Sequence, residues 1–122
     1  MALHHLDSGE IADLVKLGGE TTSTQSMALF KSEQLEVIRL RLPLGRSMPM
    51  HQVAGEITVQ CLEGVIHFET PQSVQRLQAG QLLFLRGGVP HSLVAVEDAS
   101  VLVTIALSRF DRDQPAVKKP SP

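Results

Sequence analysis

The chain has 122 residues, of which 43% are apolar, and its 11 basic and 13 acidic side chains give a formal net charge of −2. These values fit one globular domain, and the only adjacent basic pair is Lys118–Lys119, which indicates that no nucleic-acid surface is present. Cys61 is the single cysteine, which is typical of a reducing compartment. No apolar run reaches the length of a membrane span, and the first residues lack the pattern of a signal peptide. We therefore expect a cytoplasmic protein that binds neither membranes nor nucleic acid.

The sequence predicts a short N-terminal helical segment followed by strands only. Asp7 or Ser8 would cap a helix through residues 9–17, which Gly18 and Gly19 would end. Short apolar-polar runs separated by turn residues then follow, with no helical period between them. The predicted strands cover residues 27–31, 35–42, 57–62, 65–70, 74–77, 82–85, 91–96 and 101–107. This pattern predicts an all-β antiparallel sandwich or barrel.

Residues 35–42 alternate so regularly that their two faces can be assigned. Ile38, Leu40 and Leu42 would face the core, and Arg39 and Arg41 would point outward.

The whole pattern fits a single domain over residues 1–110, with the barrel itself over about 27–108. Residues 111–122 are charged and rich in proline, which predicts a disordered tail.

Two glycine–histidine frames lie between Gly45 and His91, and they resemble the two motifs of the cupin superfamily. In that family the first frame supplies two His and a Glu to a metal ion, and the second supplies one more His. The matching residues are Gly45, His51 and Gly64 in the first frame and Gly80, Gly88 and His91 in the second. The resemblance covers roughly residues 35–107. It implies a double-stranded β-helix, or jelly-roll barrel, with both histidines inside.

The metal-ligand set of the family is incomplete in this chain. The second His position of the first frame falls on Val53, and the Glu position falls on Ile57. Glu56 is one residue too early, so it would face away from the histidines unless a β-bulge at Gly55 re-aimed it. The candidate metal ligands are therefore His51 and His91, with Glu56 added only if that bulge exists. The cofactor is left open, and a divalent transition metal held by two histidines would be bound weakly.

Strand alternation predicts a ligand cavity beside the histidines. We expect each of these histidines to open a strand that lines the barrel interior. The residues expected to line the cavity are His51, Val53, Ile57, Val59, Cys61 and His91. This apolar surround favours a small single-domain protein that binds a small-molecule ligand and has no assigned activity. The resemblance implies an alternative, a metal-dependent enzyme of the oxygenase or isomerase type that uses His51 and His91. No catalytic residue is assigned, and whether the chain is an enzyme is left open.

The remaining expectations concern the outer surface. His67 would point outward, because Ile66 and Phe68 form the better core face of their strand. We expect a homodimer built on the outer sheet face, since a small core gains stability from burying further apolar surface. Leu62, Ile66 and Phe68 lie off the expected cavity face and would supply that surface.

Overall fold

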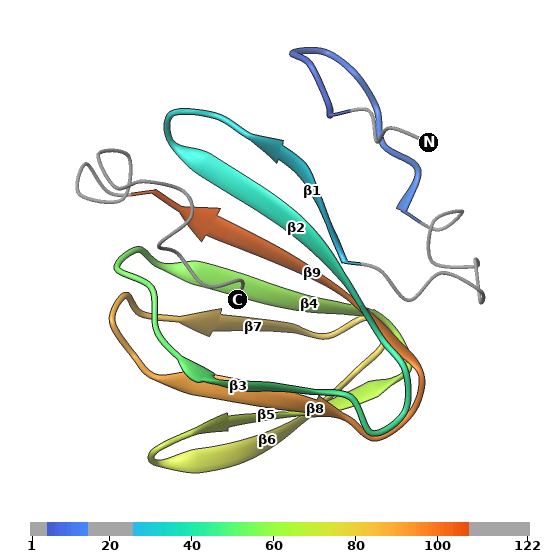
Figure 1. The fold of residues 1–122 in the computed structure, drawn as a ribbon, viewed down its shortest axis with the longest axis vertical. Helices are drawn as coiled ribbons and strands as arrows, with labels where there is room; N and C mark the ends of the chain where they lie inside the picture. Colours follow the sequence, from blue (N-terminus) through green and yellow to red (C-terminus); the bar gives the residue numbers. More distant parts are fainter. Residues whose placement is uncertain (1–4, 15–25, 108–122) are drawn as a thin grey trace.

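The structure, a computed structural model, describes residues 5–14 and 26–107 (Figure 1). Within these residues the chain forms nine β-strands and no extended helix. The strands are β1 (Met27–Lys31), β2 (Leu35–Leu42), β3 (Ser47–His51), β4 (Ile57–Glu63), β5 (Val65–Thr70), β6 (Ser73–Gln78), β7 (Leu82–Leu85), β8 (His91–Ala95) and β9 (Ala99–Ala106). All strand pairs are antiparallel, as the sequence predicts.

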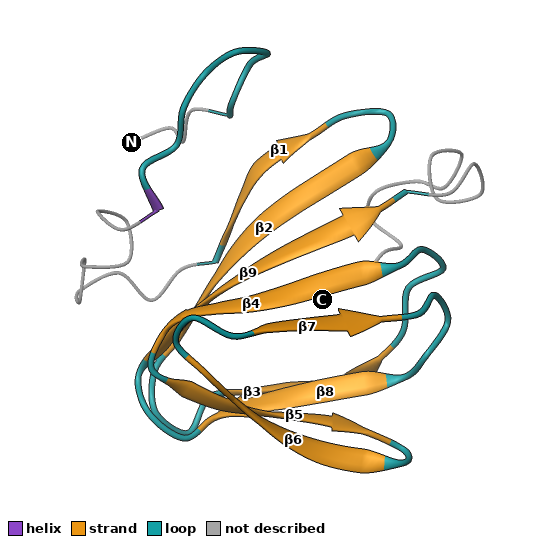
Figure 2. Ribbon diagram, turned by 180° about the vertical axis from the view of Figure 1, so that it is seen from behind, coloured by secondary structure: helices purple, strands orange, loops and turns teal. Residues whose placement is uncertain are grey.

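The strands form two sheets that pack face to face (Figure 2). One sheet has five strands in the order β1-β2-β9-β4-β7, and the other has four in the order β3-β8-β5-β6. Both sheets contribute side chains to one apolar core, among them Leu40 from β2, Ile105 from β9 and Ile66 from β5. Strands β6 and β7 are therefore the edge strands on one side of the sandwich.

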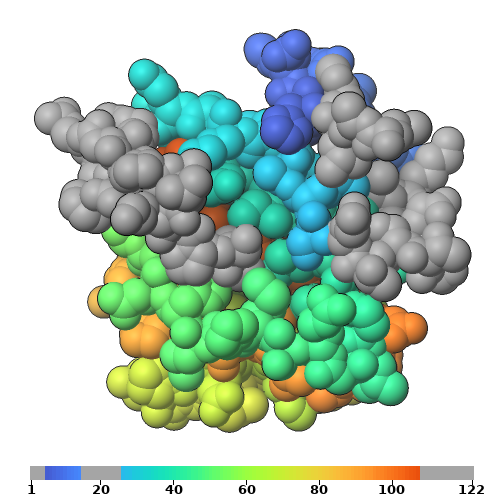
Figure 3. All heavy atoms as spheres, viewed as in Figure 1, coloured from blue at the N-terminus to red at the C-terminus, as the bar shows by residue number. Residues whose placement is uncertain are grey.

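The N-terminal helix expected through residues 9–17 is wrong over residues 9–13, and of its described residues only Leu14 is helical. Residues 9–13 are turn and loop, and Gly9 has a φ of 88°, a left-handed conformation that an α-helix does not contain. The turn is closed by hydrogen bonds from the Glu10 amide to the Asp7 carbonyl and from the Asp7 amide to Glu10 Oε1, at 3.0 and 2.7 Å. The segment lies against β1, where the Leu6 amide donates to the Leu29 carbonyl at 2.9 Å (Figure 3). Residues 15–17 of the expected helix lie outside the described residues.

Strand β3 is the one strand that the sequence pattern missed. It contains Pro49, which removes a backbone donor and indicated a turn. A proline is tolerated here because β3 is an edge strand that pairs only with β8. His51 is consequently the last residue of β3, and the expectation that it opens a strand is wrong. The expectation is correct for His91, which begins β8.

Strand β2 shows the expected alternation, with one difference in burial. Ile38, Leu40 and Leu42 are buried in the core. Arg39 belongs to the opposite face but is only 1% exposed, so it does not reach solvent. Its Nε donates to Ser100 Oγ at 2.9 Å, while its Nη2 is buried without a partner. Burial lowers the pKa of this guanidinium, and the neighbouring positive charge of Arg41 lowers it further.

The barrel described by the structure runs from β1 to Leu107. The tail expected to be disordered, residues 111–122, lies outside the described residues. No helix in the described part of the chain is long and apolar enough to cross a membrane.

Candidate functional site

The pairing of β3 with β8 brings His51 and His91 together. The two residues are register partners in this antiparallel pair, so their side chains project from the same face of the sheet. Their ring centroids are 4.5 Å apart, and the ring planes are inclined by 56°. The pair therefore forms one site, although its members are far apart in the sequence.

Both imidazoles are held in the same way by backbone carbonyl groups. Nδ1 of His51 lies 3.0 Å from the Pro49 oxygen, and Nδ1 of His91 lies 2.9 Å from the Val89 oxygen. A carbonyl oxygen only accepts, so each Nδ1 carries the proton and donates it. When such a ring is neutral, its Nε2 atom is an acceptor with a free lone pair. Both Nε2 atoms are buried and have no hydrogen-bond partner.

Burial keeps His91 in its neutral form. The residue is 2% exposed, and this desolvation lowers its pKa. The hydrogen bond to Val89 opposes the shift, and the charge of His51 adds to it. The ring of Phe68 is stacked on the imidazole of His91, with centroids 5.5 Å apart and planes inclined by 12°.

Phe68 therefore belongs to the histidine site, and the expectation that Ile66 and Phe68 lie on an outer surface is wrong. Both are buried in the core, because β5 turns this face toward the other sheet. The alternation of β5 assigned Ile66 and Phe68 to the core face of their strand, and their burial confirms this. His67, between them, is on the opposite face and is partly exposed, as expected.

The homodimer itself stays a prediction; light scattering that gives the 13.3 kDa mass of one chain would contradict it.

The apolar residues expected around the histidines are all buried in the common core. Val53 lies in the loop after β3, and Ile57, Val59 and Cys61 alternate along β4 on its core face.

Cys61 has the properties of a structural residue. Its Sγ is within hydrogen-bonding distance of two backbone oxygens, those of Glu63 at 3.3 Å and Gly64 at 3.4 Å. Burial raises the pKa of the thiol, so it remains protonated and is a poor nucleophile.

The condition for Glu56 to act as a third ligand is not met in this structure. Glu56 is exposed, and Gly55 lies in a bend before β4, outside the strand pairs in which a β-bulge could form. Gly55 has another role: a Cβ at this position would overlap the carbonyl oxygen of Ala106, so the glycine permits close packing of two backbones. The adjacent Glu56 carbonyl accepts a hydrogen bond from the Ala106 amide at 2.9 Å.

The donor set therefore fits only part of a metal site. Within residues 5–14 and 26–107, no group of three or more His, Cys, Asp or Glu side chains could hold a metal ion. Two imidazole nitrogens fall short of the three protein ligands of a catalytic zinc site and of the two-His, one-carboxylate set of many iron enzymes.

The loops next to the histidines close this end of the barrel. The Gly88 amide donates to the Val53 carbonyl at 2.8 Å, which ties the loop before His91 to the loop after His51. A Cβ at Gly87 would overlap the carbonyl oxygen of Ala54. The two loops thus meet backbone to backbone.

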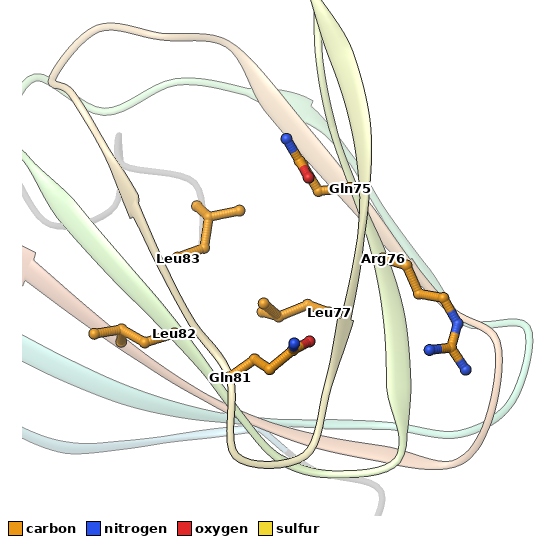
Figure 4. Close-up of a pocket in the computed structure, with 6 residues that line it drawn as sticks. All are labelled: Gln75, Arg76, Leu77, Gln81, Leu82 and Leu83. Carbon is orange, nitrogen blue, oxygen red and sulfur yellow. The ribbon is translucent and has the colours of Figure 1, made fainter.

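A groove of about 440 Å³ opens at the side of the barrel, between the edge strands β6 and β7 (Figure 4). The residues that line it are Gln75, Arg76, Leu77, Gln81, Leu82 and Leu83. Leu77 and Leu83 give it an apolar lining, while the amides of Gln75 and Gln81 are polar. The sequence did not indicate this groove, because its two strands belong to different sheets.

No family model and no curated protein matches the chain. Solved structures do match it. A conserved protein of unknown function from Streptococcus pyogenes is 23% identical with a TM-score of 0.72, over 87% of this chain and 94% of that chain. A cupin superfamily protein from Desulfitobacterium hafniense is 16% identical with a TM-score of 0.73, over 88% and 100%. An RmlC-like cupin protein from Desulfovibrio desulfuricans is 27% identical with a TM-score of 0.63, over 87% and 96%. The chain therefore has the cupin fold, the double-stranded β-helix that its sequence resemblance implies.

Proposed function

We propose that the chain binds a small uncharged molecule through the paired Nε2 atoms of His51 and His91. One observation carries the proposal: both nitrogens are buried without a partner, while the opposite ring nitrogens are bonded to carbonyl oxygens. An unsatisfied buried acceptor costs about 1–3 kcal/mol. A ligand that donates a hydrogen bond to each nitrogen recovers this cost, and the recovered free energy favours binding.

The chemistry of the pair selects the class of ligand. Two Nε2 acceptors favour a molecule with hydroxyl or N–H donors, and the lowered pKa of His91 disfavours a positive charge on that ring. Val53 and Ile57 supply apolar surface for the rest of the molecule, and Val59 and Cys61 extend it along β4.

Phenol and anisole test this assignment, because they share a flat ring and only phenol has an O–H donor. We expect phenol, with its single donor, to shift the Nε2 resonance of at least one of the two histidines in the NMR spectrum of isotope-labelled protein, and anisole to leave both in place. A His91→Phe variant should abolish the response to phenol. Equal responses to the two probes, or no response to phenol, would rule the proposal out.

A metal-dependent enzyme of the oxygenase or isomerase type is the second candidate. It is favoured by the same two nitrogens, since metal-binding imidazoles commonly donate their other N–H to a backbone carbonyl. The absence of a third protein ligand among the described residues weighs against it. Elemental analysis of protein purified without added metal separates the candidates. One iron, manganese, nickel or zinc ion per chain would support the enzyme, and a content far below one would support the small-molecule site.

A further inference from the structure

One side chain from each strand of the four-stranded sheet contributes to a diagonal row on its inner face. The row consists of His51 on β3, His91 on β8, Phe68 on β5 and Gln75 on β6. The first contact is the imidazole pair at 4.5 Å, and the second is the stack of Phe68 on His91 at 5.5 Å. Gln75 is the register partner of Phe68, so both side chains lie on the same face. The row thus runs from the histidine pair, of which His91 is buried and His51 partly exposed, to the edge of the sheet.

The far end of this row opens into the groove between β6 and β7. Figure 4 shows Gln75, Leu77 and Leu83 pointing into the groove from its two walls. Phe68 is 1% exposed, so its ring lies behind Gln75 and separates the groove from His91.

Two loops meet over the end of the barrel that is nearer to the histidines, where His51 is partly exposed and His91 is buried. The loops on that side meet through the Gly88 to Val53 hydrogen bond and the close approach of Gly87 to Ala54. The side of the barrel differs, because the side chains of Gln75 and Phe68 lead from the groove to His91. Side chains in a core change rotamer far more readily than a hydrogen-bonded backbone comes apart.

We infer that a ligand reaches His91 through the groove between β6 and β7, and that Phe68 is the gate it must displace. The inference rests on the proposed function of the histidine pair. When the Phe68 ring turns away, it uncovers a flat apolar surface on the imidazole of His91. A molecule that takes its place is flat, uncharged and about the size of one aromatic ring, since offset stacking favours such a partner.

Chemical access to His91 tests the route without requiring the natural ligand. Diethyl pyrocarbonate carbethoxylates neutral imidazole, and mass spectrometry of peptides gives the rate at His91. Gln75→Cys places a thiol in the groove, and Val74→Cys places one on the opposite face of the same strand as the matched control. Each thiol is then labelled with a bulky maleimide, while buried Cys61 stays unlabelled.

The label at position 75 should slow the modification of His91 about tenfold, and the label at position 74 should leave it unchanged. Equal rates with the two labels, or a His91 that never reacts, would overturn the route.

The gate is tested with Phe68→Leu, which keeps a buried apolar side chain but removes the ring. We expect His91 to react about tenfold faster in this variant, because a leucine side chain covers less of the imidazole face than the stacked ring does. Partly exposed His67 should react at an unchanged rate, which shows that the variant is folded. An unchanged rate at His91 would overturn the role of Phe68. Neither access measurement depends on a hydrogen-bond donor. A failed phenol test would therefore leave the route unaffected, and a failed access test would leave the proposed hydrogen bonds to Nε2 unaffected.

Discussion

Replacing His91 by Phe should make the protein more stable. The change removes an imidazole whose Nε2 is buried without a partner, and it keeps a ring that can stack on Phe68. A residue that serves ligand binding commonly lowers the stability of the folded protein. A histidine that served the fold alone would show the opposite effect, so the sign of the change separates the two roles.

The size of the effect follows from two opposing terms. Removing the unsatisfied acceptor recovers about 1–3 kcal/mol, and losing the 2.9 Å hydrogen bond to Val89 costs about 0.5–1.5 kcal/mol. The Val89 residue is partly exposed, so water can replace the lost donor. The net expectation is a gain of about 1 kcal/mol at pH 7. For a domain of this size that gain raises Tm by about 4–8 °C.

Urea unfolding at constant pH measures this difference directly. His67→Phe is the matched control, because it makes the same change at a partly exposed position on the outer face of β5. The control should lie within about 0.5 kcal/mol of the unmodified protein. A loss of more than about 2 kcal/mol in His91→Phe would refute the reasoning, since the imidazole would then contribute to the fold itself.

Burial lowers the pKa of His91, so the unfolded chain, whose histidines titrate at about 6.5, takes up the proton first as pH falls. The free energy of unfolding should therefore decrease below about pH 6.5, and a series of urea titrations should show a smaller decrease in His91→Phe. Gly87→Ala should cost about 1–3 kcal/mol, because its Cβ would overlap the carbonyl oxygen of Ala54, and an unchanged Tm would contradict this. Val53→His combined with Ile57→Glu should raise zinc affinity in a calorimetric titration and destabilise the metal-free protein, as both positions are buried; an unchanged affinity would contradict the role given to these apolar residues.

The sequence alone was sufficient for the features that depend on neighbouring residues. The alternation of apolar and polar side chains gave β1, β2, β5 and β7 with the bounds that the structure has. The frame glycines Gly45 and Gly80, with φ of 87° and 89°, occupy turns where other residues would be strained. These local signals, with the spacing of the two frames, were enough to predict the all-β fold and both histidines of the site.

The tertiary structure decided what depends on pairing between distant strands. β3 exists because β8 supplies its hydrogen bonds, and their register alone places His51 opposite His91. Arg39 is buried although it belongs to the outer face, since its exposure depends on what covers that face. The stacking of Phe68 on His91 and the groove beside β6 likewise combine residues from different strands. Periodicity gives the side of a strand on which a residue lies, whereas only the packed sheets determine which residue meets it there.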